Sequence, residues 1–275
     1  MRFSIPSVFS LSLLFGPIAS LGDAHEFWIA PQAYLVSKDA KIIAELRNGQ
    51  GFSGVNLPYL SMKTERLDIT YATQTAEITM RNGDSPALVT ASLGQGLHLL
   101  AYQSSLSVVS YEKWENFASF VVHKDLGVTK EAHLAAGFAL ENFSEIYRRF
   151  SKSLVGVGSG QGFDRALGLE VEFVAQTNPF ATEPNRGFEV LLLKDGAPSP
   201  HLQIEIFEKA PDETVNTTTT NTNAEGRALF EVKAGHSYML DAVFLRHPAA
   251  ELAQKWGADY ESRWANLTFF IPPAP

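Results

Sequence analysis

The chain has 275 residues, of which 45% are hydrophobic and 19% are charged, so it has enough apolar material for one or two packed domains. Its formal net charge is −8 and no run of lysine or arginine offsets it, which argues against a nucleic acid or an anionic membrane surface as a partner. Cysteine is absent, which excludes disulfides, thiol catalysis and thiolate metal sites. A bound metal would need nitrogen and oxygen ligands.

Residues 1–24 are expected to be a signal peptide. Met1-Arg2 provides a short positive start, 3–21 is mostly apolar, and Gly22-Asp23-Ala24 places small residues where signal peptidase cuts. Two prolines in the apolar stretch argue against a membrane-spanning helix. We therefore expect an exported, periplasmic protein that is not embedded in the membrane after cleavage. A cut after Ala24 makes His25 the first residue, whereas a cut after Gly22 leaves two residues ahead of it.

Most of the remaining chain alternates apolar and polar residues as short β-strands do, for example at 41–47, 67–71 and 168–174. The strand expected at 97–103 places Leu97, Leu99 and Ala101 on one face, and His98, Leu100 and Tyr102 on the other. A helical insertion is indicated by apolar residues at helical spacing, namely Trp114, Phe117, Phe120 and Val121. A second helix is expected from Thr129 to about Leu140.

The segment 177–187, with two prolines, is the best domain boundary. Beyond it, short strands joined by turns run from 188 to 271, and a polar, threonine-rich loop is expected at 217–222. The predicted fold is mainly β with two β-sandwich-like domains. The first covers 25–178 and carries the helical insertions, and the second is an immunoglobulin-like sandwich over 185–275.

Common catalytic motifs are missing, because no phosphate loop, nucleophile elbow or dinucleotide fingerprint is present. The glycine-rich stretch 156–162 lacks the lysine and the helix of a phosphate loop and is expected to be a flexible loop. Glu170 and Glu172 are expected on the solvated face of a strand. The sequence therefore predicts no enzyme activity.

His25 is the strongest candidate for metal binding. At a free N-terminus, its α-amine and imidazole Nδ1 could chelate one ion, because the amine loses its proton near neutral pH. An all-nitrogen set suits Ni(II) or Cu(II). Glu26 could add a carboxylate, although a solvated side chain is the simpler interpretation.

Six other histidines could complete such a site. His98, in the middle of an apolar strand, is the first choice, with a buried structural histidine as the alternative. His247, at a strand end before a proline, is a weaker third ligand. The remaining four are expected in loops or on solvated surfaces: His123, His133, His201 and His236.

Five stretches, in order, resemble a family of exported bacterial proteins of unknown function that are associated with nickel and cobalt uptake. The matching stretches are 24–31 (AHEFWIAP), 96–104 (GLHLLAYQS), 145–155 (EIYRRFSKSLV), 168–174 (GLEVEFV) and 260–269 (YESRWANLTF). The resemblance implies a periplasmic divalent-metal binder for Ni(II) or Co(II), with a membrane metal transporter as partner. His25 and His98 lie inside matched stretches. Many relatives have a histidine within the penultimate strand, where this chain has Ala242-Val243-Phe244-Leu245-Arg246-His247. The C-terminal region also resembles small transthyretin-like sandwiches.

Three functions follow from these observations. The first is a periplasmic metal-binding protein that supplies nickel or cobalt uptake. The second is a copper enzyme that uses the His25 chelate for oxidative chemistry. The third is a metal-free envelope module that recognises a glycan or a protein through aromatic side chains.

Overall fold

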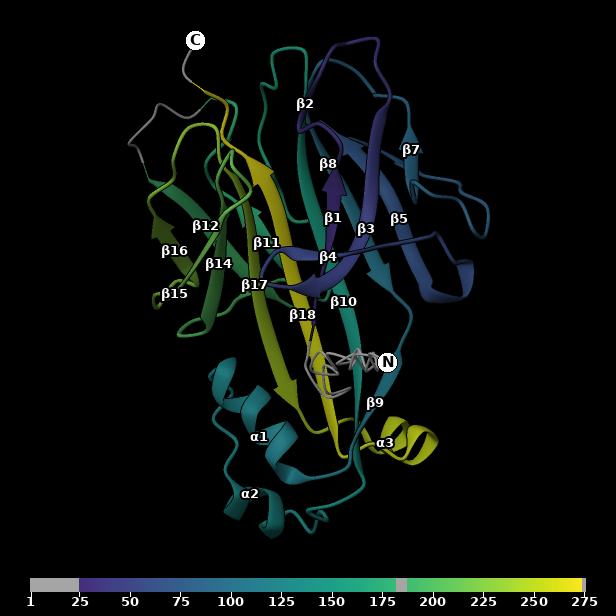
Figure 1. Cartoon of the computed structure of the whole chain (residues 1–275), viewed down its shortest axis with the longest axis vertical. Helices are drawn as coiled ribbons and strands as arrows, with labels where there is room; N and C mark the ends of the chain where they lie inside the picture. Colours follow the sequence, from purple (N-terminus) through teal and green to yellow (C-terminus); the bar gives the residue numbers. More distant parts are fainter. Residues whose placement is uncertain (1–24, 182–186, 274–275) are drawn as a thin grey trace, which may run out of the picture.

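The structure, a computed structural model, describes residues 25–181 and 187–273. The predicted signal peptide and residues 182–186 of the predicted boundary lie outside the described residues. As predicted, the chain is mainly β, with a few short helices gathered at one end (Figure 1).

Three sheets make up the described part of the chain. The first contains β1 (Glu26–Pro31), β3 (Ile42–Gln50), β4 (Ser53–Leu57) and β7 (Leu88–Thr90). The second has the path β15 (Val215–Asn221), β14 (Gln203–Lys209), β17 (Ser237–Arg246), β18 (Tyr260–Phe270), β10 (Phe143–Val157), β8 (Gly96–Ser104), β5 (Thr64–Tyr71), β6 (Gln74–Glu77). Two further strands, β2 (Leu35–Val36) and β9 (Ser107–Tyr111), also pair with β10. The third contains β11 (Val171–Ala175), β12 (Phe188–Lys194), β13 (Ala197–Pro198) and β16 (Arg227–Phe230).

The large sheet lies between the two smaller ones, and its central strands β10 and β8 carry apolar residues on both faces. In β10, Phe150 and Leu154 belong to the core shared with the third sheet, whereas Val155 and Val157 belong to the core shared with the first. Since side chains alternate across a strand, these are opposite faces of β10. Strand β8 alternates in the same way, as its sequence predicts.

The large sheet also joins the two halves of the chain. β10 pairs in parallel with β18, from Glu145 opposite Tyr260 to Ser153 opposite Thr268. β11, which precedes the expected boundary, pairs with β12, which follows it. The division into 25–178 and 185–275 remains a prediction, and both parts contribute strands to one sheet.

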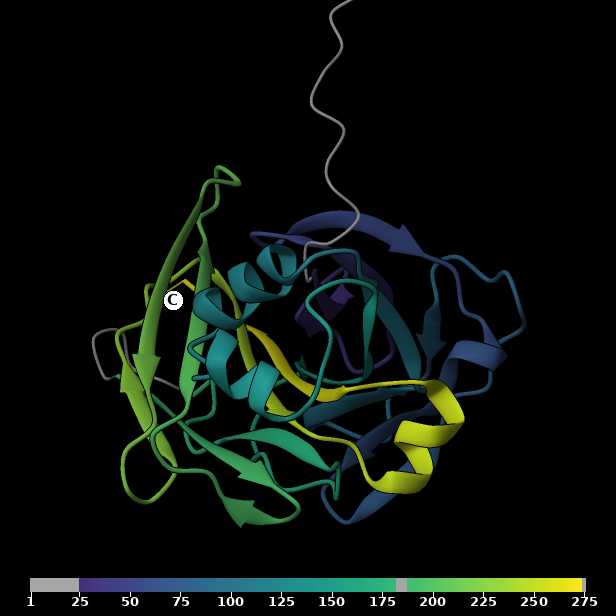
Figure 2. The same cartoon turned by 90° about the horizontal axis from the view of Figure 1, so that it is seen from below.

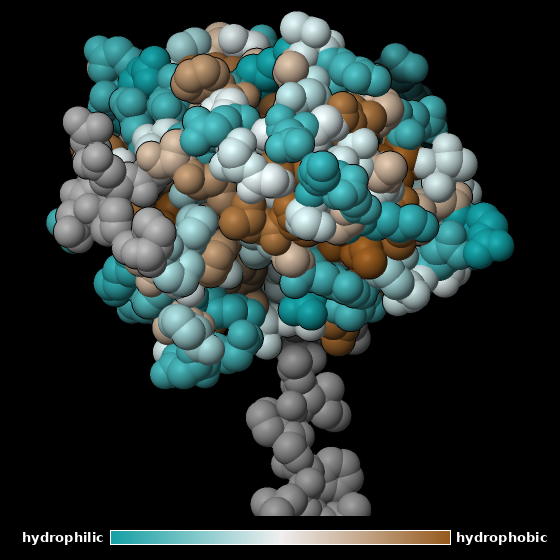
Figure 3. All heavy atoms as spheres, turned by 90° about the horizontal axis from the view of Figure 1, so that it is seen from above, coloured by the Kyte–Doolittle hydropathy of each residue, from teal (hydrophilic) through white to brown (hydrophobic). Residues whose placement is uncertain are grey.

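The helices cover one end of the large sheet, as Figure 2 shows from below. α1 (Trp114–His123) has the predicted position and packs its aromatic face against Tyr260 and Trp264. α2 (Lys130–Ala135) is shorter than expected, and Gly137 follows it with a φ of 84°. α3 (Ala250–Trp256) and the 3₁₀ turn η1 (Ser61–Lys63) were not expected. Seen from the opposite end, the surface mixes polar side chains with short apolar patches (Figure 3).

Two expectations about polar segments are wrong. The threonine-rich segment expected as a loop is the edge strand β15, because β-branched threonine suits an extended backbone. His133, expected to be solvated, is the buried residue of α2. Its Nδ1 lies 3.0 Å from the Tyr260 hydroxyl and its Nε2 lies 2.8 Å from the Ala139 carbonyl oxygen.

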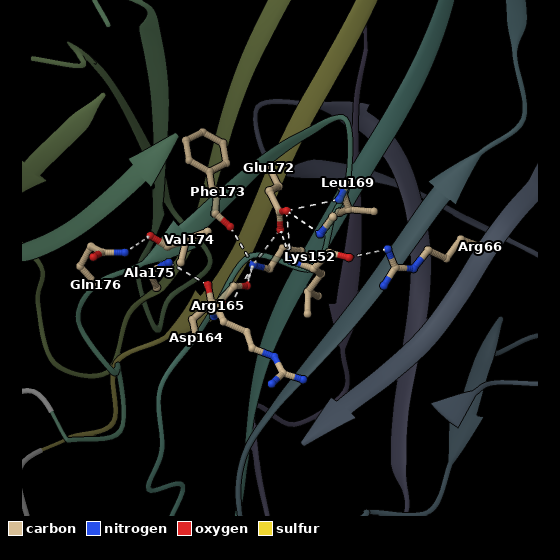
Figure 4. A network of polar contacts seen from close by, with 12 residues as sticks. Arg66, Lys152, Asp164, Arg165, Leu169, Glu172, Phe173, Val174, Ala175 and Gln176 are labelled. Carbon is tan, nitrogen blue, oxygen red and sulfur yellow. Dashed lines mark hydrogen bonds and ion pairs between the residues drawn. The ribbon is translucent and has the colours of Figure 1, made fainter. Parts of the chain in front are cut away.

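A buried ion-pair network holds the loop that joins β10 to β11 (Figure 4). Lys152 Nζ lies 2.9 Å from Asp164 and 3.5 Å from Glu172, and donates to the carbonyl oxygen of Phe173 at 2.8 Å. Glu172, expected on a solvated face, is buried and accepts the backbone N–H groups of residues 167–169. The sequence misplaced Glu172 because the preceding loop folds back over its strand.

The glycine-rich stretch is also more ordered than expected. Gly156 and Val157 belong to β10, and the Asn178 amide donates to the carbonyl oxygens of Gly160 and Gly162, each at 2.9 Å. The side-chain amide therefore ties this loop to the first residues of the expected boundary segment.

Candidate functional site

A cavity of about 430 Å³ opens beside His25, between β1, the β3–β4 hairpin, β9 and β10. This volume falls within the range of small-molecule pockets. Five rings line it: Phe27, Tyr102, Tyr111, Tyr147 and Trp264. The rest of the lining is aliphatic or polar: His25, Leu46, Asn48, Leu57, Pro58, Leu60, Lys63, Thr64, Ser104, Ser107, Val109, Glu145 and Arg149.

Strand β10 brings the two charged groups of the inner wall together. Glu145, Tyr147 and Arg149 occupy alternate positions, so their side chains project from the same face of the strand, toward the first sheet. The parallel neighbour β18 adds Trp264 opposite Arg149. Aromatic rings from two sheets therefore surround a carboxyl group and a guanidinium group.

The Arg149 guanidinium lies among three rings, with its central carbon 5.8 Å from the centroid of Phe27, 5.2 Å from that of Tyr147 and 5.6 Å from that of Trp264. Its Nη1 donates to the carbonyl oxygen of His25 at 2.6 Å. Burial lowers the pKa of Arg149, and the nearby Tyr147 hydroxyl and more distant carboxylates offset part of that effect. The side chain is thus a partly buried cation at the cavity wall.

Glu145 is buried next to Arg149. Its carboxyl group accepts hydrogen bonds from the Tyr111 hydroxyl at 2.7 Å and from the Ser262 hydroxyl. Burial raises the pKa of Glu145 to about 7, although both hydrogen bonds and Arg149 act in the opposite direction. Glu145 therefore changes charge near neutral pH.

A second cluster of charged groups lies behind this wall. Lys124, directly after α1, points its ammonium at Glu26 (3.4 Å), Asp241 (2.8 Å) and Glu205. The three carboxylates have oxygens within 4.8 Å of one another, a spacing that could suit a metal ion, but the Lys124 ammonium contacts all three. Burial lowers the pKa of Lys124, but the carboxylates outweigh burial and raise it above its usual value. The cluster is therefore an ion-pair network in which lysine supplies the cation.

These contacts fix the start of the predicted mature chain. Glu26, for which a solvated side chain was the simpler interpretation, is buried, and its second oxygen accepts the backbone N–H of Gly51 at 3.2 Å. Burial raises the pKa of Glu26 to about 7. The Glu26 side chain and the His25 carbonyl are both held, and His25 lies at the cavity wall.

The other two predicted metal ligands lie elsewhere. His98 is fully buried, with Nδ1 3.1 Å from the Gly96 carbonyl oxygen and Nε2 3.0 Å from the backbone nitrogen of Leu93. Its ring stacks on Tyr71 at 4.8 Å, and burial lowers its pKa, which favours the neutral ring. Both ring nitrogens are therefore occupied by backbone groups.

The positions of the three histidines along β10 differ. His98 is opposite Val155, six residues beyond Arg149, which is about 20 Å along a strand. His247 is exposed near the other end, with Nδ1 3.1 Å from the Asp259 carbonyl oxygen. The structure does not bring His25, His98 and His247 to one point, and their role as metal ligands remains a prediction.

Sequence reasoning missed Arg149 and Glu145 as site residues. A usable signal was present, because Glu145 and Arg149 alternate with Tyr147 on one face of a strand whose last residues are apolar on both faces. Lys124, Glu205 and Asp241 meet only through tertiary contacts between distant segments, so no local pattern indicates their cluster.

The fold and the site define a mainly β protein with a small aromatic cavity on one face of its large sheet. The chain belongs to the family described as a domain of unknown function (DUF4198), whose model matches residues 22–246. The comparison with curated proteins gives no match. Among solved structures, the D0-D1 domain of Intimin is similar at 10% identity and a TM-score of 0.22, over 89% of this chain and 97% of that chain. Within the described residues, no helix is long and apolar enough to cross a membrane.

Proposed function

We propose that this chain is an exported binding protein that holds a small, largely apolar molecule in the cavity beside His25. The observation that carries the proposal is the cavity itself, with about 430 Å³ of space, aromatic walls, one buried carboxyl group and one partly buried guanidinium group. A mainly apolar pocket with a few convergent polar groups is the usual form of a small-molecule site.

The walls of the cavity are held in place before any ligand enters. Phe27 and Tyr102 stack with their centroids 4.8 Å apart, and the Tyr102 hydroxyl donates to the carbonyl oxygen of Lys63 at 2.9 Å. The backbone N–H of Arg149 donates to the Ser104 hydroxyl at 3.0 Å. Rigid walls favour binding because little side-chain freedom is lost when the ligand enters.

Two tryptophan substitutions on adjacent residues of β9 test the proposal. Val109 lines the cavity, whereas its neighbour Val108 is exposed and lies outside the lining. Val109→Trp should fill the cavity and abolish binding of the neutral fluorescent probe N-phenyl-1-naphthylamine, and Val108→Trp should leave binding unchanged. Near-ultraviolet circular dichroism checks that both variants are folded. Equal binding by the two variants would contradict the proposal.

The position of His25 favours a second candidate function, transition-metal binding. Export with cleavage after Ala24 would give His25 a free amine, and the residue lines the cavity with its carbonyl held by Arg149. Amine and imidazole nitrogens suit Ni(II), Co(II) or Cu(II), and two ligands leave other coordination positions for solvent or a cavity ligand. Such a protein could present nickel or cobalt to a membrane transporter in the periplasm.

Native mass spectrometry of the exported chain with Ni(II) and Cu(II) tests this second function. One alanine added before His25 should abolish stoichiometric binding, because the chelating amine is displaced. Loss of metal binding in His98→Ala or His247→Ala as well would identify those residues as further ligands. To bind the metal through Nδ1, each histidine would have to give up its hydrogen bond with the carbonyl oxygen of Gly96 or Asp259. Equal affinity in the native and extended chains would exclude the His25 chelate.

A further inference from the structure

We propose that the molecule bound in the cavity is an organic anion, with a carboxylate paired to Arg149 and an apolar body against the aromatic wall. This inference rests on the proposed function of the cavity as a ligand site. It adds the chemical class of the ligand and the residue that recognises it.

The first argument is the missing counterion of Arg149. The buried cation Lys124 contacts three carboxylates and the buried cation Lys152 contacts two. Arg149, by contrast, has no Asp or Glu oxygen within 4.0 Å in 25–181 and 187–273. A partly buried charge without a counterion is costly, and a bound anion would reduce that cost.

The second argument is the geometry of the guanidinium group. Phe27, Tyr147 and Trp264 surround the group, and the His25 carbonyl oxygen takes one N–H donor of Nη1. A guanidinium group has five N–H donors in a fixed plane, so a carboxylate can accept two of them side by side. The same rings that hold Arg149 offer an apolar surface to the rest of the ligand.

Glu145 gives the site a dependence on pH. The groups around its carboxyl are Tyr111 on β9, Tyr147 and Arg149 on β10, and Ser262 on β18, and His25 and Lys63 also line the cavity. A carboxylate on Arg149 would repel an ionised Glu145, so binding favours the protonated form. We therefore expect the anion to bind more tightly at pH 6 than at pH 8.

A matched pair of ligands tests the inference without any substitution. 2-Naphthoate and 2-naphthamide have nearly the same shape, but only the first is charged. Isothermal titration calorimetry should show at least tenfold tighter binding of 2-naphthoate to the native protein. Equal affinities would overturn the anion proposal and leave the cavity as a site for neutral molecules.

Substitution at two adjacent arginines assigns the preference to a residue. Arg149→Met should remove the preference for 2-naphthoate while 2-naphthamide still binds. Arg148→Met is the control, because Arg148 projects from the other face of β10 toward Glu65 and Glu170. If Arg149→Met does not fold, Arg149→Lys keeps the charge without the planar fork and should weaken 2-naphthoate binding selectively. If the Arg149 variants still prefer 2-naphthoate over 2-naphthamide, Arg149 does not recognise the carboxylate. If the native protein binds neither 2-naphthoate, 2-naphthamide nor N-phenyl-1-naphthylamine, the proposed function itself is wrong.

Discussion

At the scale of single residues, two buried lysines and one partly buried arginine in the described part of the chain differ in what surrounds them. Lys124 and Lys152 are enclosed by carboxylates and carbonyl oxygens, whereas Arg149 is enclosed by rings. The two lysines therefore act as internal ties between strands. Arg149 keeps hydrogen-bonding capacity that the described part of the chain does not use.

Glu145→Gln should reduce the dependence of stability on pH. The pKa of Glu145 is about 7 in the folded chain against 4.5 as its ordinary value, so between these values the folded state binds more protons than the unfolded state. The free energy of unfolding should then fall as pH rises from about 4.5 to about 7, by up to about 3 kcal/mol. Glu26 has a similarly raised pKa and contributes in the same direction, so part of the pH dependence of stability should remain in Glu145→Gln.

Urea denaturation of the native protein and of Glu145→Gln at pH 5 and pH 8 measures this difference. Glu170→Gln is the matched control, since Glu170 lies partly exposed against Arg148 and Arg263. An unchanged pH dependence in Glu145→Gln would show that Glu145 is ionised in the folded protein at pH 5.

The sequence predicted the face of His98 correctly but not its contacts. Alternation in β8 is a local pattern, and it placed His98 on the same face as Leu100 and Tyr102. The hydrogen bond from Leu93 to His98 depends on how the loop before β8 turns back, which no spacing in the sequence reports. His133 and Glu172 were misplaced for the same kind of reason.

At the scale of elements, α1 does more than cover the end of the sheet. Its apolar face packs on β17 and β18, and the residue directly after it, Lys124, inserts its side chain between β1, β14 and β17. One helical insertion thus connects strands from both halves of the chain. The helix was predictable from the spacing of its aromatic residues, but the ion pairs of Lys124, directly after it, were not.

Lys124→Met should lower the free energy of unfolding by about 3–5 kcal/mol, because it leaves three buried carboxylates without their cation. Lys130→Met, on the exposed side of α2, should change stability by less than about 0.5 kcal/mol. Thermal and urea unfolding of the two variants provide the comparison. A loss below about 1 kcal/mol in Lys124→Met would mean that the carboxylates bind protons or water in place of lysine.

The strand boundaries show where local patterns suffice. The strand expected at 188–194 matches β12, and that expected at 97–103 differs from β8 by one residue at each end. By contrast, β15 was mistaken for a loop because its threonines face solvent and carry no alternation of apolar residues. An edge strand without a buried face lacks the signal on which strand prediction depends.

At the scale of the whole molecule, the ten-stranded sheet contains strands from both predicted domains. The core beneath β10 and β18 includes Leu97 and Leu154 from the first half and Phe188 and Phe269 from the second. No local feature of the sequence reveals the β10–β18 pairing, because strand partners are selected by tertiary packing.

We expect a single unfolding transition in differential scanning calorimetry, with equal calorimetric and van't Hoff enthalpies. Leu154→Ala, which removes side-chain volume from the shared core, should destabilise that transition by about 2–5 kcal/mol without splitting it. Val55→Ala, at an exposed position in β4, is the control and should leave the transition in place. Two separate transitions, only one of which moves in Leu154→Ala, would show that the halves unfold independently.

The place of β18 has a consequence for how the molecule is made. It is the last strand along the described chain, yet it fills the gap between β17 and β10, and its partner on β10 precedes it by 115 residues, from Glu145 to Tyr260. Until β18 arrives, both neighbours present bare hydrogen-bonding edges and the shared core is incomplete. Contacts of such long sequence separation form slowly. The core shared by β10 and β18 would therefore be completed only when nearly all of the described chain has been synthesised, whereas the core against the first sheet uses only residues 27–157 and can form earlier.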